Sequence, residues 1–102
     1  MLFHITSQHN WETCEGSREF KGENVPPRSE RQRWLEGNEK VKVIGAYGCQ
    51  TQHRYYAIVE ANDYDDVRGL FSGAGHLRTG EVEVVPINDG IANRKAFGEW
   101  GK

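Results

Sequence analysis

Residues 41–61 read VKVIGAYGCQTQHRYYAIVEA, and the rest of the chain is arranged around them. Two runs rich in Val, Ile, Tyr and Ala lie on either side of the polar residues Gln50, Thr51 and Gln52. Runs of this length and composition, joined by a short polar turn, are typical of a β-hairpin. Alternation in the first run predicts one face with Val41, Val43, Gly45 and Tyr47 and the opposite face with Lys42, Ile44 and Ala46. In the second run it separates Tyr55, Ala57 and Val59 from Tyr56, Ile58 and Glu60.

One strand and one helix are predicted before the hairpin. Residues 2–7 alternate, which predicts a strand with Phe3 and Ile5 toward the core. Residues 8–25 are polar and have no sustained period, so we expect a long loop that Trp11 anchors to the body.

The helix of this first half is predicted over residues 27–36. Pro27 suits the first helical position, and Gly37 is a typical stop. The apolar face of this helix is thin and consists mainly of Trp34 and Leu35.

A second helix and a last strand are predicted after the hairpin. Asn62 is a good N-cap, and Gly73 and Gly75 end the helix. The spacing predicts a core-facing stripe made of Tyr64, Val67, Leu70 and Phe71. Residues 81–87 alternate again, with Val82 and Val84 inward. The tail, residues 88–102, carries Ile91, Ala92, Phe97 and Trp100, which suggest docking on its own domain or on a neighbouring subunit.

The order strand, helix, strand, strand, helix, strand predicts an α+β domain over residues 1–87. Right-handed crossovers favour the ferredoxin-like βαββαβ antiparallel sheet, of strand order 4-1-3-2, with two helices on one face. The helix side then buries Phe3, Ile5, Val41, Val43, Ala57, Val59, Val82 and Val84. The open face carries Leu2, His4, Thr6, Ile44, Ala46, Tyr56, Ile58 and Val85. That face is too apolar to be left in water, so a homodimer that covers it is expected.

Composition limits the partners. The 102 residues are 36% hydrophobic and 27% charged, as in an ordinary soluble domain. A net charge of −2 gives no electrostatic footprint for nucleic acid or an anionic membrane. No apolar run approaches the roughly 20 residues of a membrane span, and no signal peptide is evident. The two cysteines, Cys14 and Cys49, are expected to be free thiols in a reducing cytoplasm rather than one disulfide.

Two segments resemble a bacterial family of small uncharacterised domains. They are the opening MLFHIT, with His9 and Cys14 after it, and the hairpin VKVIGAYGCQTQHRYYAIVEA. The resemblance covers about residues 1–15 and 41–87, and it implies the dimeric α/β-barrel version of the ferredoxin-like fold. Related folds include muconolactone isomerases and antibiotic-biosynthesis monooxygenases, which work on small organic substrates. Fold analogy does not fix function, and no catalytic residues are transferred.

One end of the predicted sheet gathers nitrogen and sulfur donors. The loop after the first strand, the hairpin turn and the loop after the second helix meet there, with His9, Cys14, Cys49, His53 and His76. Such donors suit Zn²⁺ or another transition metal. The spacings match no standard zinc motif, and loop residues of this fold lie at that end in any case.

His4 is the candidate acid or base. It lies in the middle of a central strand and faces the open side, where a histidine can transfer protons near neutral pH. The residues that would bind a substrate beside it are Thr6, Tyr56, Ile44, Ile58 and Glu60. The alternative is a buried histidine that forms a hydrogen bond across a dimer interface. For Cys49 a half-buried thiol is favoured over a nucleophile, because no third group orients the pair with His53.

These observations favour a cytoplasmic dimeric domain that binds a small organic molecule in a cleft on the open face. Acid–base catalysis is left open, and no cofactor is identified. One alternative is a non-catalytic interaction module whose open face is only a dimer interface. The other is a metal-binding protein that uses His9, His53 and His76 with a cysteine.

Overall fold

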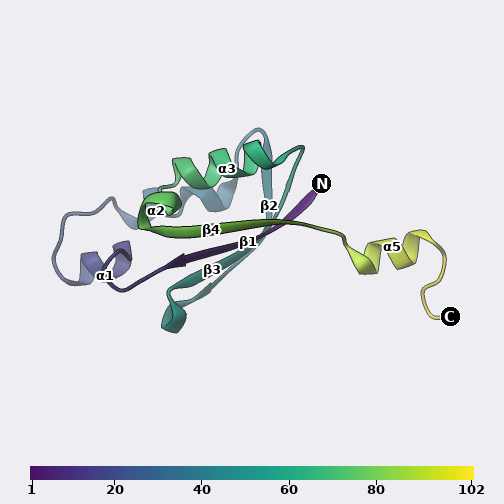
Figure 1. The fold of residues 1–102 in the computed structure, drawn as a ribbon, viewed down its shortest axis with the longest axis horizontal. Helices are drawn as coiled ribbons and strands as arrows, with labels where there is room; N and C mark the ends of the chain where they lie inside the picture. Colours follow the sequence, from purple (N-terminus) through teal and green to yellow (C-terminus); the bar gives the residue numbers. More distant parts are fainter.

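A computed structural model describes residues 1–102 and shows an α+β fold with an open four-stranded antiparallel sheet (Figure 1). The strands are β1 (Leu2–His9), β2 (Val41–Cys49), β3 (Arg54–Ala61) and β4 (Gly80–Ile87). The helices are α1 (Glu15–Phe20), α2 (Arg28–Arg31), α3 (Tyr64–Gly73), α4 (His76–Thr79) and α5 (Gly90–Ala96), with 3₁₀ helices at Arg33–Glu36 and Gln50–Gln52. The order across the sheet is β2-β3-β1-β4. The predicted α+β class and antiparallel sheet are confirmed, and the arrangement is consistent with a ferredoxin-like fold.

The core lies between α3 and the face of the sheet that α3 covers (Figure 1). Its buried apolar residues are Phe3, Ile5, Trp34, Val41, Ala57, Val59, Ala61, Val67, Leu70 and Phe71. Val43, Val82 and Val84 pack against it while partly buried, so the predicted helix-facing set is confirmed. No helix combines the length and the apolar character that a membrane span requires.

The predicted start of the second helix is wrong by one residue. Asp63, rather than Asn62, is the N-cap of α3, and its carboxylate accepts a hydrogen bond of 2.9 Å from the Asp66 amide. An N-cap carboxylate also interacts favourably with the helix dipole. Tyr64 follows as the first helical residue and is 52% exposed, so it does not belong to the buried stripe.

The predicted helix over residues 27–36 is broken at Gln32, whose φ of −102° and ψ of 7° separate α2 from a 3₁₀ turn. The tighter turn carries Trp34 into the core, where it is 5% exposed. Gly37 ends the segment with a φ of 71°, and a Cβ there would approach the Val41 carbonyl oxygen to 2.4 Å. Only glycine fits this position, because both the backbone angle and the space exclude a side chain.

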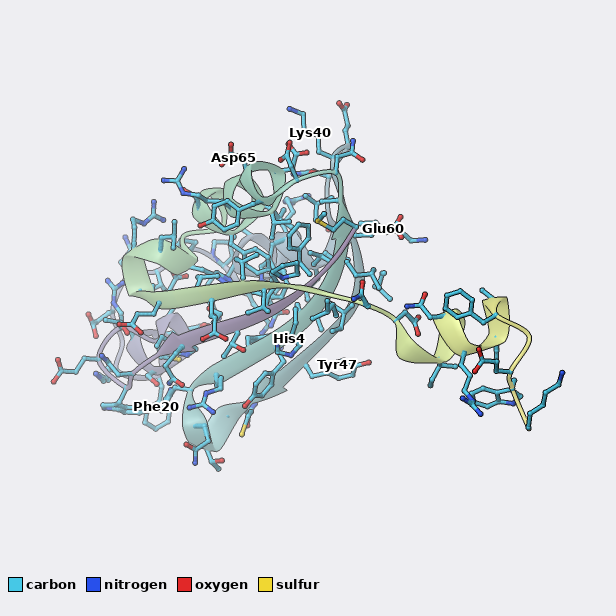
Figure 2. The ribbon with its side chains drawn as sticks, turned by 45° about the vertical axis from the view of Figure 1, so that its right-hand side comes forward. His4, Phe20, Lys40, Tyr47, Glu60 and Asp65 are labelled. Carbon is cyan, nitrogen blue, oxygen red and sulfur yellow. The ribbon has the colours of Figure 1, made fainter.

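A β-bulge in β2 overturns part of the predicted hairpin alternation. The pairing of β2 with β3 shifts between Val43 and Gly45, so that Ala46 lies opposite Ala57 and Tyr47 opposite Tyr56. Ala46 therefore packs against the core, whereas Tyr47 lies on the open face (Figure 2). An extra residue in one strand inverts the facing of every residue beyond it.

The region predicted as a long loop contains regular structure. The first strand continues through His9, and α1 follows within residues 8–25. Trp11 lies edge-on to the His53 ring at 6.1 Å, so it contacts the hairpin turn while remaining 49% exposed. A further helix of one turn, α4, has no counterpart in the predicted elements.

The tail extends away from the domain in both views of the ribbon (Figures 1 and 2). The helix α5 begins after Asp89, whose carboxylate accepts a hydrogen bond of 2.9 Å from the Ala92 amide. Ile91, Phe97 and Trp100 are all more than half exposed. Docking of the tail on its own domain, one of the two predicted options, is not observed.

Candidate functional site

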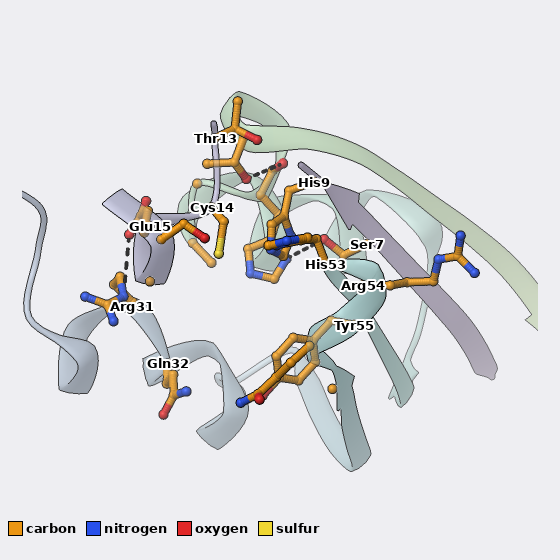
Figure 3. A pocket seen from close by; sticks show the side chains of 18 of the residues that line it. Ser7, His9, Thr13, Cys14, Glu15, Arg31, Gln32, His53, Arg54 and Tyr55 are labelled. Carbon is orange, nitrogen blue, oxygen red and sulfur yellow. Dashed lines mark hydrogen bonds and ion pairs between the residues drawn. The ribbon is translucent and has the colours of Figure 1, made fainter. Parts of the chain in front are cut away.

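A cavity of about 510 Å³ lies at the end of the sheet, on the face that carries the helices (Figure 3). The ends of β1, β2 and β3 form one wall, and α1, the segment around Trp34 and the turn before α4 form the others. Aromatic side chains supply much of the apolar lining: Trp11, Phe20, Trp34 and Tyr55. The volume falls within the range of natural small-molecule sites, about 300–1,000 Å³.

A polar pair, the buried Ser7 and the half-buried His76, lies in the lining of this cavity. Their side chains form a hydrogen bond of 3.2 Å between Ser7 Oγ and His76 Nδ1. The imidazole packs against both Trp34 and Phe71, whose ring centroids are each 5.2 Å away. Burial, with a smaller contribution from the charge of His9, lowers the pKa of His76 to about 4. The ring is therefore neutral at physiological pH.

Arg31 links α1 to α2 beside the cavity. Its guanidinium lies 2.9 Å from a carboxylate oxygen of Glu19 and 3.8 Å from a carboxylate oxygen of Glu15. A dashed line in Figure 3 marks the pair of Arg31 and Glu15. It also donates a hydrogen bond of 2.7 Å to the Pro26 carbonyl. With only 14% of its side chain exposed, Arg31 holds α1 in place and has its charge matched by carboxylates.

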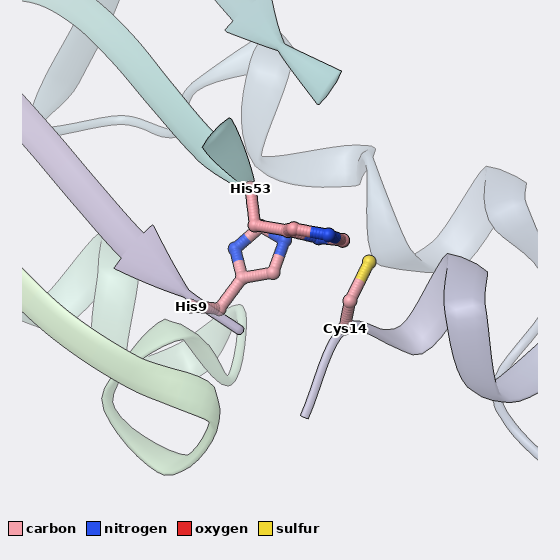
Figure 4. Close-up of side chains that lie close together, drawn as sticks. All are labelled: His9, Cys14 and His53. Carbon is pink, nitrogen blue, oxygen red and sulfur yellow. The ribbon is translucent and has the colours of Figure 1, made fainter. Parts of the chain in front are cut away.

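Three potential metal ligands converge in the lining: His9, Cys14 and His53 (Figure 4). One ligand atom from each lies within 4.8 Å of the others, and all three residues are half-buried. The His9 and His53 rings lie edge to face, with their centroids 5.4 Å apart. Burial, and then the charge of His53, lowers the pKa of His9. Two imidazole nitrogens and a thiolate are a donor set that zinc and copper both accept.

Backbone hydrogen bonds place these three residues. The His9 amide donates to the His53 carbonyl at 3.0 Å, which ties the end of β1 to the hairpin turn. His53 itself has a φ of 51°, a left-handed conformation in which histidine is several-fold enriched among residues other than glycine. The Asn10 side chain accepts from the amides of Glu12 and Thr13, and the Cys14 amide donates to the Asn10 carbonyl at 2.8 Å.

All five predicted metal ligands line the cavity, but two of them do not join the cluster. Cys49 pairs with Arg54 beyond the bulge, so its side chain belongs to the open face. Its Sγ lies 3.6 Å from Thr51 Oγ1, and this hydrogen bond is the main cause that lowers the pKa of Cys49. His76 is held away by Ser7 and its aromatic neighbours. Both cysteines are free thiols.

The residues predicted around His4 share the open face, away from the cavity. His4 lies opposite Ile58 and Val85, and its ring centroid is 6.2 Å from that of Tyr56. Thr6 pairs with Tyr56, Glu60 lies exposed at the end of β3, and Ile44 is in the bulge and 53% exposed.

Sequence reasoning missed the polar contacts of Arg54. Its Nε donates to Gln8 Oε1 at 2.6 Å, and its Nη1 donates to the Tyr56 hydroxyl at 3.2 Å. It also missed the cavity wall of Ser7, Trp34 and Tyr55. For Ser7 a signal existed, because it continues the alternation of Phe3 and Ile5 toward the helix face.

Comparisons with known proteins add no relative: no protein-family model matches the chain, and no curated protein is significantly similar to it. The function is therefore argued from the geometry of the cavity and of the sheet.

Proposed function

We propose that this protein binds a small organic molecule in the cavity at the end of the sheet. The observation that carries the proposal is the 510 Å³ volume, walled by four aromatic residues. Aromatic walls favour a flat, largely apolar ligand, and a few convergent polar groups fix its orientation. Gln32 on the rim and the Ser7–His76 pair supply such groups.

The location of this site differs from the cleft expected on the open face. His4 does not line the cavity, since β1 directs it to the opposite side of the sheet. Acid–base catalysis by His4 is therefore a separate proposal, which concerns a site that a second subunit would complete.

Two adjacent tyrosines test which face binds the ligand. Tyr55 lines the cavity and Tyr56 lies on the open face. We would screen aromatic acids, amides and neutral aromatic fragments by ligand-observed NMR, and measure affinities for the wild type, Tyr55→Ala and Tyr56→Ala. The proposal expects Tyr55→Ala to weaken binding by at least about tenfold, or 1.4 kcal/mol, and Tyr56→Ala to leave it within about twofold. The reverse pattern would place the ligand on the open face.

We also infer that a second copy covers the open face, as in the dimeric α/β-barrel version of the ferredoxin-like fold. Support comes from its exposed apolar residues, among them Ile44, Tyr47 and Val85, and from a tail that carries three more away from the domain. The resemblance to the bacterial family implies the same assembly, and two free thiols suit a cytoplasmic location.

Light scattering after size-exclusion chromatography tests this assembly. The wild type is expected to elute with the mass of two chains. Replacing Tyr47 by Glu would place a charge on the face that the second copy buries, and is expected to give a monomer. Replacing Tyr64 by Glu, at a similarly exposed position on α3, is the matched control and is expected to remain dimeric. A monomeric wild type at all concentrations would contradict the inference.

A further inference from the structure

We propose that His9, Cys14 and His53 bind one transition-metal ion, with Zn²⁺ as the first candidate. The inference does not depend on the proposed ligand of the cavity, because it concerns only these three side chains. Imidazole nitrogen and thiolate sulfur are the ligands that zinc sites in proteins use most. Calcium and magnesium prefer oxygen ligands, so this donor set disfavours them.

The distances between the three ligand atoms suit a shared ion. With zinc–nitrogen bonds of about 2.0–2.1 Å and a zinc–sulfur bond of about 2.3 Å, tetrahedral ligand atoms lie about 3.3–3.6 Å apart. The atoms of His9, Cys14 and His53 all lie within 4.8 Å of one another. These separations exceed the tetrahedral ones by at most about 1.5 Å, a difference that we expect rotations about side-chain bonds to close.

The three ligands come from separate segments that the backbone already fixes. His9 ends β1, His53 ends the hairpin turn, and one backbone hydrogen bond of 3.0 Å joins the two residues. Cys14 follows a turn closed by the Asn10 side chain. Ser7 forms its side-chain hydrogen bond with the ring of His76. This bond therefore does not involve the rings of His9 and His53, the two proposed ligands. A site fixed in this way loses little conformational entropy when the ion binds.

Three protein ligands leave one position of a tetrahedral ion for water or a bound molecule. All three residues line the cavity, so that position lies next to the space available to a small ligand. Structural zinc sites, by contrast, are closed by four protein ligands. An ion held there would present that position to the cavity.

Cobalt titration of the full-length, reduced and chelator-treated protein is the direct test. Tetrahedral Co²⁺ gives intense visible bands, and a thiolate ligand adds a near-ultraviolet charge-transfer band. We expect both to saturate at one equivalent and to disappear when Zn²⁺ displaces the cobalt.

Substitutions identify the ligands. Cys14→Ser is expected to abolish the thiolate band, whereas Cys49→Ser, the matched control, retains it. His53→Asn is expected to weaken binding by at least about tenfold, since even changes outside the ligand shell reach that size. Asparagine tolerates the left-handed backbone of His53, so this variant keeps the turn.

A measurement on the wild type tests the proposal without relying on variants that could fail to fold. Both cysteines are free and half-buried, so we expect each to react with an alkylating reagent, and mass spectrometry counts the modified thiols. Zn²⁺ is expected to protect Cys14 and to leave Cys49 reactive. The proposal is overturned if neither ion binds at one equivalent, if binding survives both ligand substitutions, or if Zn²⁺ protects Cys49 instead.

Discussion

Similar residues have different surroundings on the two faces of the sheet. On the helix face, Tyr55 packs edge-on against Trp34 at 5.3 Å and lines the cavity with His9 and His53. On the open face, the neighbouring Tyr56 accepts a hydrogen bond from Arg54 and lies beside His4. Loops and short helices enclose the first group, whereas the second group has only other strand residues around it. A single chain therefore builds a cavity on one face, and a site on the other would need a second subunit.

The largest expected effect concerns the wall of the cavity. Replacing Trp34 by Ala removes a side chain that is 5% exposed and packs on Phe71 and Tyr55. We expect a loss of about 3–5 kcal/mol in the free energy of unfolding, measured by urea denaturation, because a large cavity is left in the core. Trp100→Ala, in the exposed tail, is the control and is expected to cost less than about 0.5 kcal/mol. Equal losses would mean that the tail packs as firmly as the core.

The second effect is the pH dependence that His76 introduces. Its pKa of about 4 in the folded protein lies below the ordinary value of 6.5, so the unfolded chain binds the proton more readily. Above pH 6.5 His76 is neutral in both states and does not reduce the free energy of unfolding. As the pH falls from 6.5 toward 4, the unfolded chain takes up the proton first, and the free energy of unfolding decreases. The shift corresponds to about 3 kcal/mol at its limit.

Urea denaturation of the metal-free protein across this pH range measures the effect. His76→Asn removes the titrating group while keeping a polar partner for Ser7. The wild type is expected to lose more stability between pH 6.5 and 4 than this variant does. Parallel pH profiles for the two proteins would show that His76 is not buried as described.

A smaller difference in stability is expected between substitutions of two arginines in the same segment. Arg31 joins α1 to α2 with 14% of its side chain exposed, whereas Arg33 pairs with Glu30 on the surface with 63% exposed. We expect Arg31→Leu to lower the free energy of unfolding by about 1 kcal/mol and Arg33→Leu to leave it unchanged, since solvent screens exposed ion pairs. Hydrogen exchange of the α1 amides is expected to accelerate only in the first variant. Unchanged exchange in Arg31→Leu would show that other contacts hold α1 at the cavity.

The smallest effect is expected on the open face. Tyr56→Phe removes the hydroxyl that accepts a hydrogen bond of 3.2 Å from Arg54. Water can then form a hydrogen bond with the Arg54 guanidinium in its place. We expect a loss of about 0.5 kcal/mol or less at low protein concentration. A larger, concentration-dependent loss would show that the open face is buried between two copies, which would sharpen the distinction between the faces.

Much of the fold could be predicted because the local patterns are strong. Alternation in β1, β3 and β4 identified the residues that face the core, and helical spacing identified three of the four residues of the α3 stripe. The errors fall where tertiary packing overrides local preference. Burial of Trp34 breaks the helix before β2, and a single extra residue near Gly45 inverts the end of that strand.

The candidate site shows the same division. The topology placed His9, Cys14, Cys49, His53 and His76 at one end of the sheet, and all five line one cavity there. Three of these residues form the cluster and two do not, and this separation depends on the bulge and on the hydrogen bond between Ser7 and His76. Neither feature has a local sequence signal, since each arises from contacts between distant segments.

The class of the fold, most of the core and the end of the sheet where reactive side chains gather could be inferred from the linear chain. These follow from hydrophobic periodicity and from the order of the elements, which are properties of the chain alone. Two features come only from the folded arrangement: the cavity lies on the helix face rather than beside His4, and His9, Cys14 and His53 converge. The reason is physical: a cavity and a set of ligands depend on angstrom-scale packing between segments, and alternation along a strand specifies a face but no distance.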